Sequence, residues 1–215
     1  MQIGKVAKWS VSAARIAAAK ARLGRRLHLP RGGKPVYLGR GVRLVVEKDG
    51  VMELGSGAYI DDCCRLQVSR GARMSLGEGC YLNTNCRVVA VEDVEIGAHT
   101  MFGPNVCVFD HDHVFDAGGV RRDLISAPIV VGERCWLGAN SLVTRGVSIA
   151  GKICVGGGCV VTHPLVEPGV YVGAPARLLR RFGQADGGQG EPPAECEEVR
   201  LCDRVSEGPQ QPLIA

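Results

Sequence analysis

The sequence predicts a mainly β protein, a solenoid of short strands, and three observations carry this prediction. Glycine supplies 30 of the 215 residues, aromatic residues make up only 5%, and aliphatic residues recur at a fixed six-residue interval. A chain rich in glycine and poor in rings suits short strands and tight turns around a narrow core. With 46% hydrophobic and 22% charged residues, the chain fits one ordinary domain, and disorder along its whole length is excluded.

The six-residue repeat is the most informative of these observations. Its longest run is Val131, Leu137, Val143, Ile149, Val155 and Val161. In a helix, residues six apart lie on nearly opposite faces, and a half-buried strand has a period of two. A solenoid satisfies the interval, because three six-residue steps close one triangular coil and stacked coils pair at ~4.8 Å. Shorter runs begin at Leu54, Leu76 and Ile96.

The longest break in the repeat lies between residues 108 and 131. It predicts a loop that leaves the solenoid and carries the sequence Asp110-His111-Asp112-His113. Loops held by a rigid scaffold often carry functional residues, so this segment is the first candidate for a site.

Two flanks differ from the repeat, and we divide the chain into 1–34, 35–182 and 183–215. Eleven basic residues precede the first acidic one, Glu47, and alanine-rich residues 5–27 are predicted to form an amphipathic helix. This helix either adheres to an anionic membrane surface or caps the open end of the solenoid. The last segment has seven acidic residues against two basic ones and is predicted to be a disordered acidic tail.

The ten cysteines could indicate a secreted disulfide framework, but the length and the start of the chain argue against it. The N-terminus shows no secretory signal, and because no C-x-x-C pair occurs the usual zinc spacings are missing as well. We therefore expect reduced thiols that fill the core of a cytoplasmic protein, and no metal site. No stretch of 18 uncharged apolar residues is present, so no membrane-spanning helix is predicted either.

From about residue 54 to 181 the chain resembles the hexapeptide-repeat acyltransferases, in particular their maltose/galactoside and polysaccharide O-acetyltransferase branch. The resemblance rests on the segments PIVVGERCWLGANSLVTRGVSIAGKICVGGGCVVT and VYVGAPARLLRR, together with the histidines of the extruded loop. It implies a left-handed parallel β-helix, an exception to the right-handed rule for crossovers. It also implies a homotrimer with active sites between neighbouring subunits. No nucleic-acid partner is expected.

The resemblance assigns His113 as the catalytic base, because the family places a histidine nine residues after the proline of a P-N-V segment, here Pro104. An imidazole suits this role because it exchanges protons near neutral pH. His111, two residues away, is the alternative. We expect the two rings to point to opposite sides of an extended loop, so that only one of them faces the acceptor.

The resemblance also implies binding residues. Asn83 matches an acceptor-binding asparagine, although an asparagine in a left-handed turn is an equal alternative. Acetyl-CoA, the implied cosubstrate, would contact Trp136, Ala139, Gly157, Thr162, His163, Arg177 and Arg180. His163 is the weakest of these assignments, because the family often has Lys-Asp-[IV]-Pro after the threonine and this chain has His163-Pro164.

The predicted function is acetyl-CoA-dependent O-acetyl transfer to a sugar or glycan hydroxyl in a ternary complex. Two alternatives stay open, a metalloenzyme of the γ-carbonic-anhydrase type and a non-catalytic scaffold. The acceptor itself is open among sugars, glycans, amino acids and antibiotics, and N-acetylation is also open. Residues 1–34 could bring the protein to the inner membrane face, which would suit a carrier-linked glycan.

Overall fold

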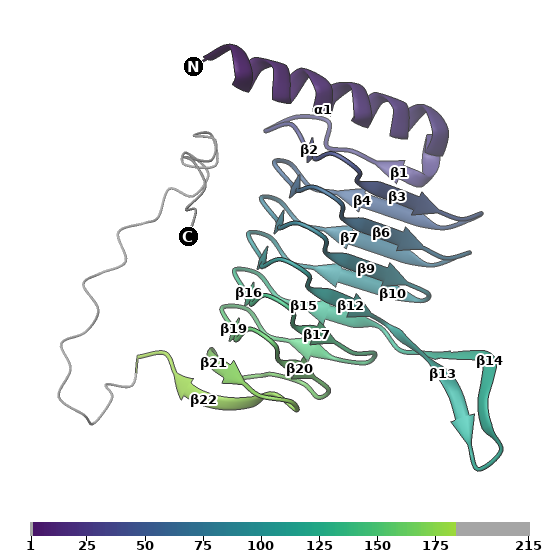
Figure 1. The fold of residues 1–215 in the computed structure, drawn as a ribbon, viewed down its shortest axis with the longest axis vertical. Coiled ribbons are helices and arrows are strands. Elements are labelled where there is room, and N and C mark those ends of the chain that lie inside the picture. Colours follow the sequence, from purple (N-terminus) through teal and green to yellow (C-terminus); the bar gives the residue numbers. More distant parts are fainter. Residues whose placement is uncertain (1, 184–215) are drawn as a thin grey trace, which may run out of the picture.

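The computed structural model describes residues 2–183 and the side chains from residue 7 onward. The predicted acidic tail lies outside these residues, apart from Gly183. The chain forms a triangular parallel β-solenoid of six coils, preceded by the helix α1 (Gln2–Leu23) and the short 3-10 turn η1 (Gly24–Arg26). Figure 1 shows the coils stacked below α1, with a long hairpin projecting from the lower half of the stack. The predicted mainly β solenoid is confirmed, and the left-handed sense stays a prediction of the resemblance.

Each side of the triangle is one sheet whose neighbours come from successive coils. Sheet A contains β1 (Leu27–His28), β4 (Val51–Leu54), β7 (Arg73–Leu76), β10 (Asp93–Ile96), β15 (Ile129–Val131) and β18 (Ser148–Ile149). Sheet B contains β2 (Tyr37–Leu38), β5 (Tyr59–Ile60), β8 (Tyr81–Leu82), β11 (Met101–Phe102), β16 (Trp136–Leu137), β19 (Cys154–Val155), β21 (Gly169–Val172) and β22 (Arg177–Arg181). Sheet C contains β3 (Arg43–Val46), β6 (Arg65–Val68), β9 (Arg87–Ala90), β12 (Cys107–Phe109), β17 (Leu142–Val143) and β20 (Val160–Val161).

The register of the sheets explains both the repeat and its breaks. Leu54 pairs with Leu76 in an early coil, and Val131 pairs with Ile149 in a late one, so the early coil takes up more of the chain. The longer coils have four-residue strands in sheets A and C, and these strands bury two side chains each instead of one. Two of the three sides of the triangle are thereby lengthened. The irregular intervals in the early part of the sequence are therefore longer strands, and the solenoid is not interrupted there.

The first sheet begins earlier than the predicted boundary at residue 35. Leu27 and His28 already pair with Met52 and Glu53, so the segment 1–34 contains the first strand of sheet A. The helix ends at Leu23. Gly24 follows with φ 59°, a left-handed conformation that ends helices readily because glycine has no Cβ.

The helix α1 closes the open end of the solenoid. It buries Ser12, Ala19 and Leu23, and Ile16 packs against the core. The buried hydroxyl of Ser12 accepts a hydrogen bond of 2.8 Å from the backbone N–H of Leu38 in the first coil.

Several basic side chains of α1 and η1 also turn toward the first coil. Arg15, Arg22 and Arg26 donate to the carbonyl oxygens of Leu38, Leu44 and Val46 at 3.1, 2.8 and 2.7 Å. These carbonyls belong to end strands that have no further coil to pair with. The capping interpretation of the basic helix therefore has direct support. No helix within residues 2–183 combines the length and the apolar character needed to cross a membrane.

The thiols of the described cysteines are all free, and most are inside the solenoid. Their sulfurs are more than fillers, because several donate to carbonyl oxygens of the neighbouring coil. Cys86 Sγ lies 3.2 Å from the carbonyl oxygen of Gly103, and Cys135 Sγ lies 3.1 Å from that of Ala150. Thr100 fills the position equivalent to Cys135 one coil earlier and donates to Gly132 at 2.8 Å. Small donors at these positions therefore satisfy corner carbonyls of the neighbouring coil.

Candidate active site

The segment between β12 and β15 forms an antiparallel hairpin of β13 (His111–Asp116) and β14 (Gly119–Ser126). The predicted loop does leave the solenoid, but it is an ordered pair of strands. Its base is closed by a hydrogen bond of 2.9 Å from the Ala127 N–H to the Asp110 carbonyl oxygen. Arg145, at a corner of a later coil, ties the hairpin down through a contact of 2.7 Å with Asp112.

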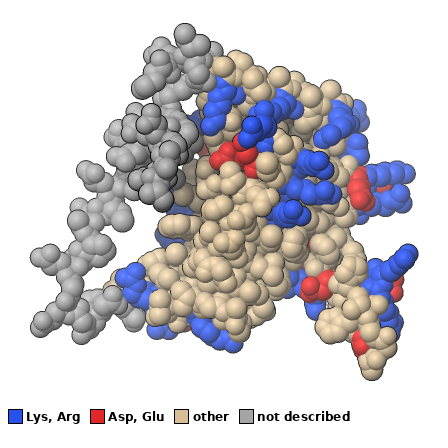
Figure 2. All heavy atoms as spheres, viewed as in Figure 1, with Lys and Arg blue, Asp and Glu red and all other residues tan. Residues whose placement is uncertain are grey.

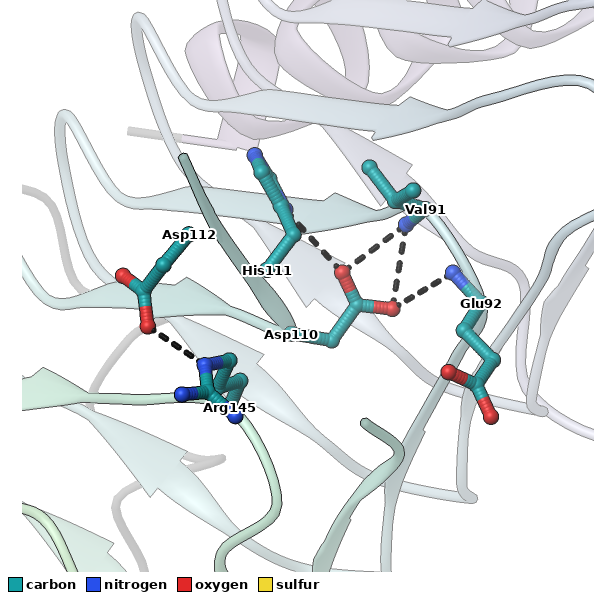
Figure 3. A network of polar contacts seen from close by, with 6 residues as sticks. All are labelled: Val91, Glu92, Asp110, His111, Asp112 and Arg145. Carbon is teal, nitrogen blue, oxygen red and sulfur yellow. Dashed lines mark hydrogen bonds and ion pairs between the residues drawn. The ribbon is translucent and has the colours of Figure 1, made fainter. Parts of the chain in front are cut away.

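Asp110 anchors this hairpin from inside the protein. Its side chain is fully buried and accepts backbone N–H bonds from Val91 at 2.8 and 3.0 Å and from Glu92 at 2.8 Å. These two N–H groups belong to the tight corner between β9 and β10, where the chain turns directly from sheet C into sheet A. The same carboxylate lies 3.1 Å from Nδ1 of His111 (Figure 3). Sequence inspection named Asp110 as part of the extruded segment but assigned a role only to the histidines.

His113 lies on the exposed part of β13, and its Nδ1 is 3.1 Å from the backbone carbonyl oxygen of Arg121. A carbonyl oxygen only accepts hydrogen bonds, so a neutral His113 that makes this bond carries its proton on Nδ1. Nε2 then holds the free lone pair. By the same argument the carboxylate of Asp110 places the proton of a neutral His111 on Nδ1.

The expected opposition of the two histidines is wrong. Residues 111–116 are an extended strand in which His111 pairs with Ser126 and His113 with Leu124. Alternate residues of a strand lie on the same face, so His111 and His113 share one side of β13. Both rings are therefore available on that side, and orientation alone does not choose between them.

Asn83 lies where β8 turns into the next side of the triangle, at the corner between sheets B and C. Its Oδ1 accepts a hydrogen bond of 2.7 Å from the N–H of Thr84, and its Nδ2 has no partner among the described residues. The left-handed position of this turn belongs instead to Asn85, with φ 60°. Asn85 is the first of three asparagines stacked along the corner. Its Nδ2 donates to Oδ1 of Asn105 at 2.7 Å, and Nδ2 of Asn105 donates to Oδ1 of Asn140 at 3.1 Å.

Of the seven residues assigned to acetyl-CoA, Trp136, Arg177 and Arg180 lie in sheet B, and Ala139 and Gly157 lie at the corner between sheets B and C. Trp136 is paired with Cys154, which is paired with Val170, and Val170 faces Arg180 across the β21–β22 turn. Trp136 is 55% exposed, so the indole is open to a ligand. Ala139 and Gly157 are stacked one coil apart, and a Cβ on Gly157 would lie 3.2 Å from the Ala139 carbonyl oxygen.

Thr162 and His163 follow β20, and Arg177 of β22 reaches them. His163 lies between Thr162, whose Oγ1 is 3.4 Å away, and Arg177, whose Nη1 is 3.1 Å from Nε2. All of these contacts are at the surface. An arginine beside an imidazole is an arrangement that could hold an anionic group such as a phosphate. His163, the weakest of the acetyl-CoA assignments, thus lies beside Arg177, one of the two arginines expected to contact acetyl-CoA.

A single chain does not bring the predicted acceptor residue and the predicted base together. Asn83 is at the corner between sheets B and C, whereas the hairpin with His113 follows β12 and leaves at the corner between sheets C and A. The full width of sheet C separates the two corners. Within residues 2–183 no group of three histidine, cysteine, aspartate or glutamate side chains is arranged to hold a metal ion.

The fold and the hairpin define a class of protein, the β-solenoids built from hexapeptide repeats. No family model matches the sequence. The chain is 29% identical over 109 residues to WbbJ of Escherichia coli strain K12, whose name assigns it provisionally to lipopolysaccharide biosynthesis as an O-acetyl transferase. It is 31% identical over 95 residues to the galactoside O-acetyltransferase of Lactococcus lactis. Each match covers 44% of this chain, and 54% and 46% of the respective relatives.

Among solved structures, the hexapeptide-repeat-containing acetyltransferase VCA0836 of Vibrio cholerae, complexed with acetyl coenzyme A, superposes with a TM-score of 0.52. The match has 21% identity and covers 78% of this chain and 79% of that one, and it shows the shared fold. The chain spans about half the length of the curated relatives that it matches. The resemblance to hexapeptide-repeat acyltransferases is therefore confirmed in the fold and in part of the sequence.

Proposed function

We propose that this protein transfers an acetyl group from acetyl-CoA to a hydroxyl of a sugar or glycan, with His113 as the general base. The observation that carries the proposal is the contact of His113 Nδ1 with the Arg121 carbonyl oxygen at 3.1 Å. It leaves Nε2 as an unprotonated acceptor at the surface of an extruded hairpin. The relatives named above are O-acetyltransferases by name, which supports the reaction class.

In the proposed reaction His113 Nε2 removes the proton of the acceptor hydroxyl as the oxygen attacks the thioester carbon. The new C–O bond forms, the C–S bond breaks, and the leaving thiolate takes the proton back from the imidazolium. A backbone N–H would stabilise the tetrahedral oxyanion. Covalent catalysis by cysteine is not needed, and burial raises the pKa of the Cys80 and Cys135 thiols, which disfavours the nucleophilic thiolate.

The site is proposed to lie between two copies of the chain. Asn83 and His113 occupy different corners of one triangle, so they can act on one acceptor only if they come from different protomers. Exposed apolar side chains on the hairpin, among them Phe115 and Val120, would gain a partner in such an assembly. A homotrimer is the closed arrangement implied by the resemblance. Measurement of the molecular mass in solution tests this part of the proposal.

His111 is the second candidate for the base, because the buried carboxylate of Asp110 orients its ring. Parallel His113→Ala and His111→Ala variants decide between the two. We expect His113→Ala to lower kcat by about 10²- to 10⁴-fold at unchanged thermal stability. The His111→Ala variant should lower kcat by a smaller factor. Full activity in folded His113→Ala would overturn the assignment, and a larger loss in His111→Ala would transfer it to His111.

The acceptor is to be identified with labelled acetyl-CoA and a panel of nucleotide sugars, lipid-linked glycans and amino compounds. Transfer to amines only would replace O-acetylation by N-acetylation. Calorimetry with acetyl-CoA separates the enzyme from a scaffold, which would not bind it. A metal assay on the purified protein tests the γ-carbonic-anhydrase alternative.

A cytoplasmic location and peripheral contact of residues 1–34 with anionic membranes are further parts of the proposal. Binding of residues 1–34 to a membrane would compete with their capping role, because Arg15, Arg22 and Arg26 already bind carbonyl oxygens of the first coil. If a variant without residues 1–34 pellets with anionic vesicles as well as the full chain does, the membrane part is dropped. The same comparison requires that this variant is shown to be folded.

A further inference from the structure

The outer face of sheet C carries a column of three arginines that no part of the mechanism uses. Arg43 pairs with Arg65, and Arg65 pairs with Arg87, so the three side chains leave adjacent parallel strands in register. Each is the first residue of its strand and points away from the core, as the alternating burial of β3, β6 and β9 shows. We call this column the arginine ladder. Its rungs are separated by the spacing of neighbouring strands, ~4.8 Å.

No carboxylate compensates the ladder. Within residues 7–183, none of the three guanidinium groups has an acidic partner, and the neutral side chain of Gln67 contacts Arg65 at 2.7 and 3.1 Å. The other outward positions of these strands are Val45, Gln67 and Val89. Like charges directly opposite one another in a sheet are destabilising. The fold therefore tolerates an electrostatic cost at this place, which is expected where the charges serve to bind an anion.

The positive face is extended by the cap of the solenoid. Arg22 reaches the carbonyl oxygen of Leu44, next to the first rung, and Arg26 reaches that of Val46 at the other end of β3. Figure 2 shows several Lys and Arg side chains over the upper half of the view, where β3, β6 and β9 lie in Figure 1, and further ones on the projecting hairpin and at the lower edge.

The ladder ends one coil before β12, the strand that leads into the histidine hairpin. Arg87 pairs with Cys107 on β12, and the neighbouring outward column continues from Val89 to Phe109. The ring of His111 lies edge-on to that of Phe109, with centroids 6.1 Å apart. A chain lying along the ladder reaches the start of β12, and the hairpin begins beyond the other end of this three-residue strand, after Phe109. The proposed anion-binding surface and the strand that leads into the histidine hairpin therefore belong to the same sheet.

We propose that the arginine ladder binds a linear anionic glycan and thereby selects the acceptor for acetylation. Guanidinium groups bind carboxylates and phosphates through paired hydrogen bonds. Three of them in one line match an extended chain with recurring charges better than a single compact anion. The choice of a glycan rests on the proposed acetyl transfer, whereas the binding of an anion rests on the ladder alone.

The test uses the full chain and three oligosaccharide or polymer probes of similar length. They are polygalacturonate oligosaccharides, which carry carboxylates, neutral dextran oligosaccharides, and inorganic polyphosphate. We expect the carboxylated glycan to bind, more weakly as salt is raised, and the neutral one not to bind. The Arg65→Gln variant should weaken binding about tenfold, consistent with the loss of one charged hydrogen-bonded contact.

Arg73→Gln is the matched control, because Arg73 is also the first residue of a four-residue strand but lies on sheet A beside Glu53. It should bind the carboxylated probe as the natural sequence does. Equal affinity in Arg65→Gln, or binding of polyphosphate without any binding of the carboxylated glycan, would overturn the proposal. A change in the solution mass of Arg65→Gln would also overturn it, because the ladder would then be a contact between copies.

Thermal unfolding gives an independent readout. Arg65→Gln should unfold at the same temperature as the natural sequence or higher, because like-charge repulsion is relieved. A clear fall would indicate a structural role and contradict the proposal. In acetylation assays Arg65→Gln should raise KM about tenfold for an anionic acceptor and leave a neutral acceptor unchanged. Absence of transfer to every acceptor, with ladder-dependent binding intact, would remove the proposed function and leave the ladder as an anion site.

Discussion

The carboxylate of Asp110 lies 3.1 Å from Nδ1 of His111 and is fully buried beneath the hairpin that carries both histidines. The same two oxygens receive three N–H contacts from the corner between β9 and β10. One side chain therefore joins a tight corner of the solenoid to the segment that contains the proposed base. The position of the histidines depends on this carboxylate as much as on the hairpin itself.

Replacement of Asp110 by asparagine should destabilise the protein. The amide keeps one acceptor oxygen but turns its NH₂ group toward a backbone donor, which leaves a buried N–H without a partner. We expect a loss of about 2 kcal/mol or more in the free energy of unfolding, measured by denaturant titration. Asp112→Asn is the control, since the exposed Asp112–Arg145 pair should contribute less than about 1 kcal/mol. Equal losses in both variants would contradict the anchoring role of Asp110.

Gly97 is expected to be intolerant of any side chain. A Cβ at this position would lie 2.5 Å from the carbonyl carbon of Gly132 and 2.6 Å from the nitrogen of Glu133, both backbone atoms of the next coil. Gly97→Ala must therefore push two coils apart, and we expect a loss of about 1–3 kcal/mol in thermal or chemical unfolding. Gly32→Ala, where no atom lies within 4 Å, should change stability little. If the two variants unfold alike, the close approach of the coils is not essential.

Ser12 should matter for the cap of the solenoid. Its hydroxyl is the acceptor for the Leu38 N–H, and both groups are buried. Ser12→Ala leaves this N–H without a partner, at a cost of about 1–3 kcal/mol. Ser148→Ala, an exposed serine on sheet A, serves as the control. Hydrogen exchange should be faster at Leu38 in Ser12→Ala only, and unchanged exchange would argue against the capping contact.

Stability should fall at alkaline pH in part through Cys80. Burial raises the pKa of this thiol from 9.0 to about 11, so the folded state holds the proton more tightly than the unfolded state. The stabilising contribution is complete below pH 9 and is lost as the pH rises toward 11. We expect Cys80→Ala to lose less stability than the natural sequence across this range, measured as the midpoint of thermal unfolding. The exposed Cys63 offers the control: Cys63→Ala should follow the natural sequence over the same range.

The solenoid and the lengths of its coils show where sequence reasoning reached its limit. The six-residue interval predicted the solenoid because each step places one aliphatic residue on a common axis, a local rule visible in one dimension. The same rule did not show that the coil from Leu54 to Leu76 is longer than three six-residue steps. The length of a strand depends on which residues of the neighbouring coil it pairs with, and the sequence does not display that pairing. The arginine ladder was equally present in the sequence, since Arg43, Arg65 and Arg87 are evenly spaced along the chain.

The sequence by itself determined that short strands stack in a coil, that a basic helix precedes them, and that histidines lie on an extruded segment. These follow from periodicity, glycine content and charge, which are properties of neighbouring residues. Only the tertiary structure decided that Asp110 is buried beside His111, that three arginines share one face, and that Asn83 and His113 occupy different corners. Such relationships join residues of different coils, and their distances are set by the register of the sheets, which the order of residues does not display.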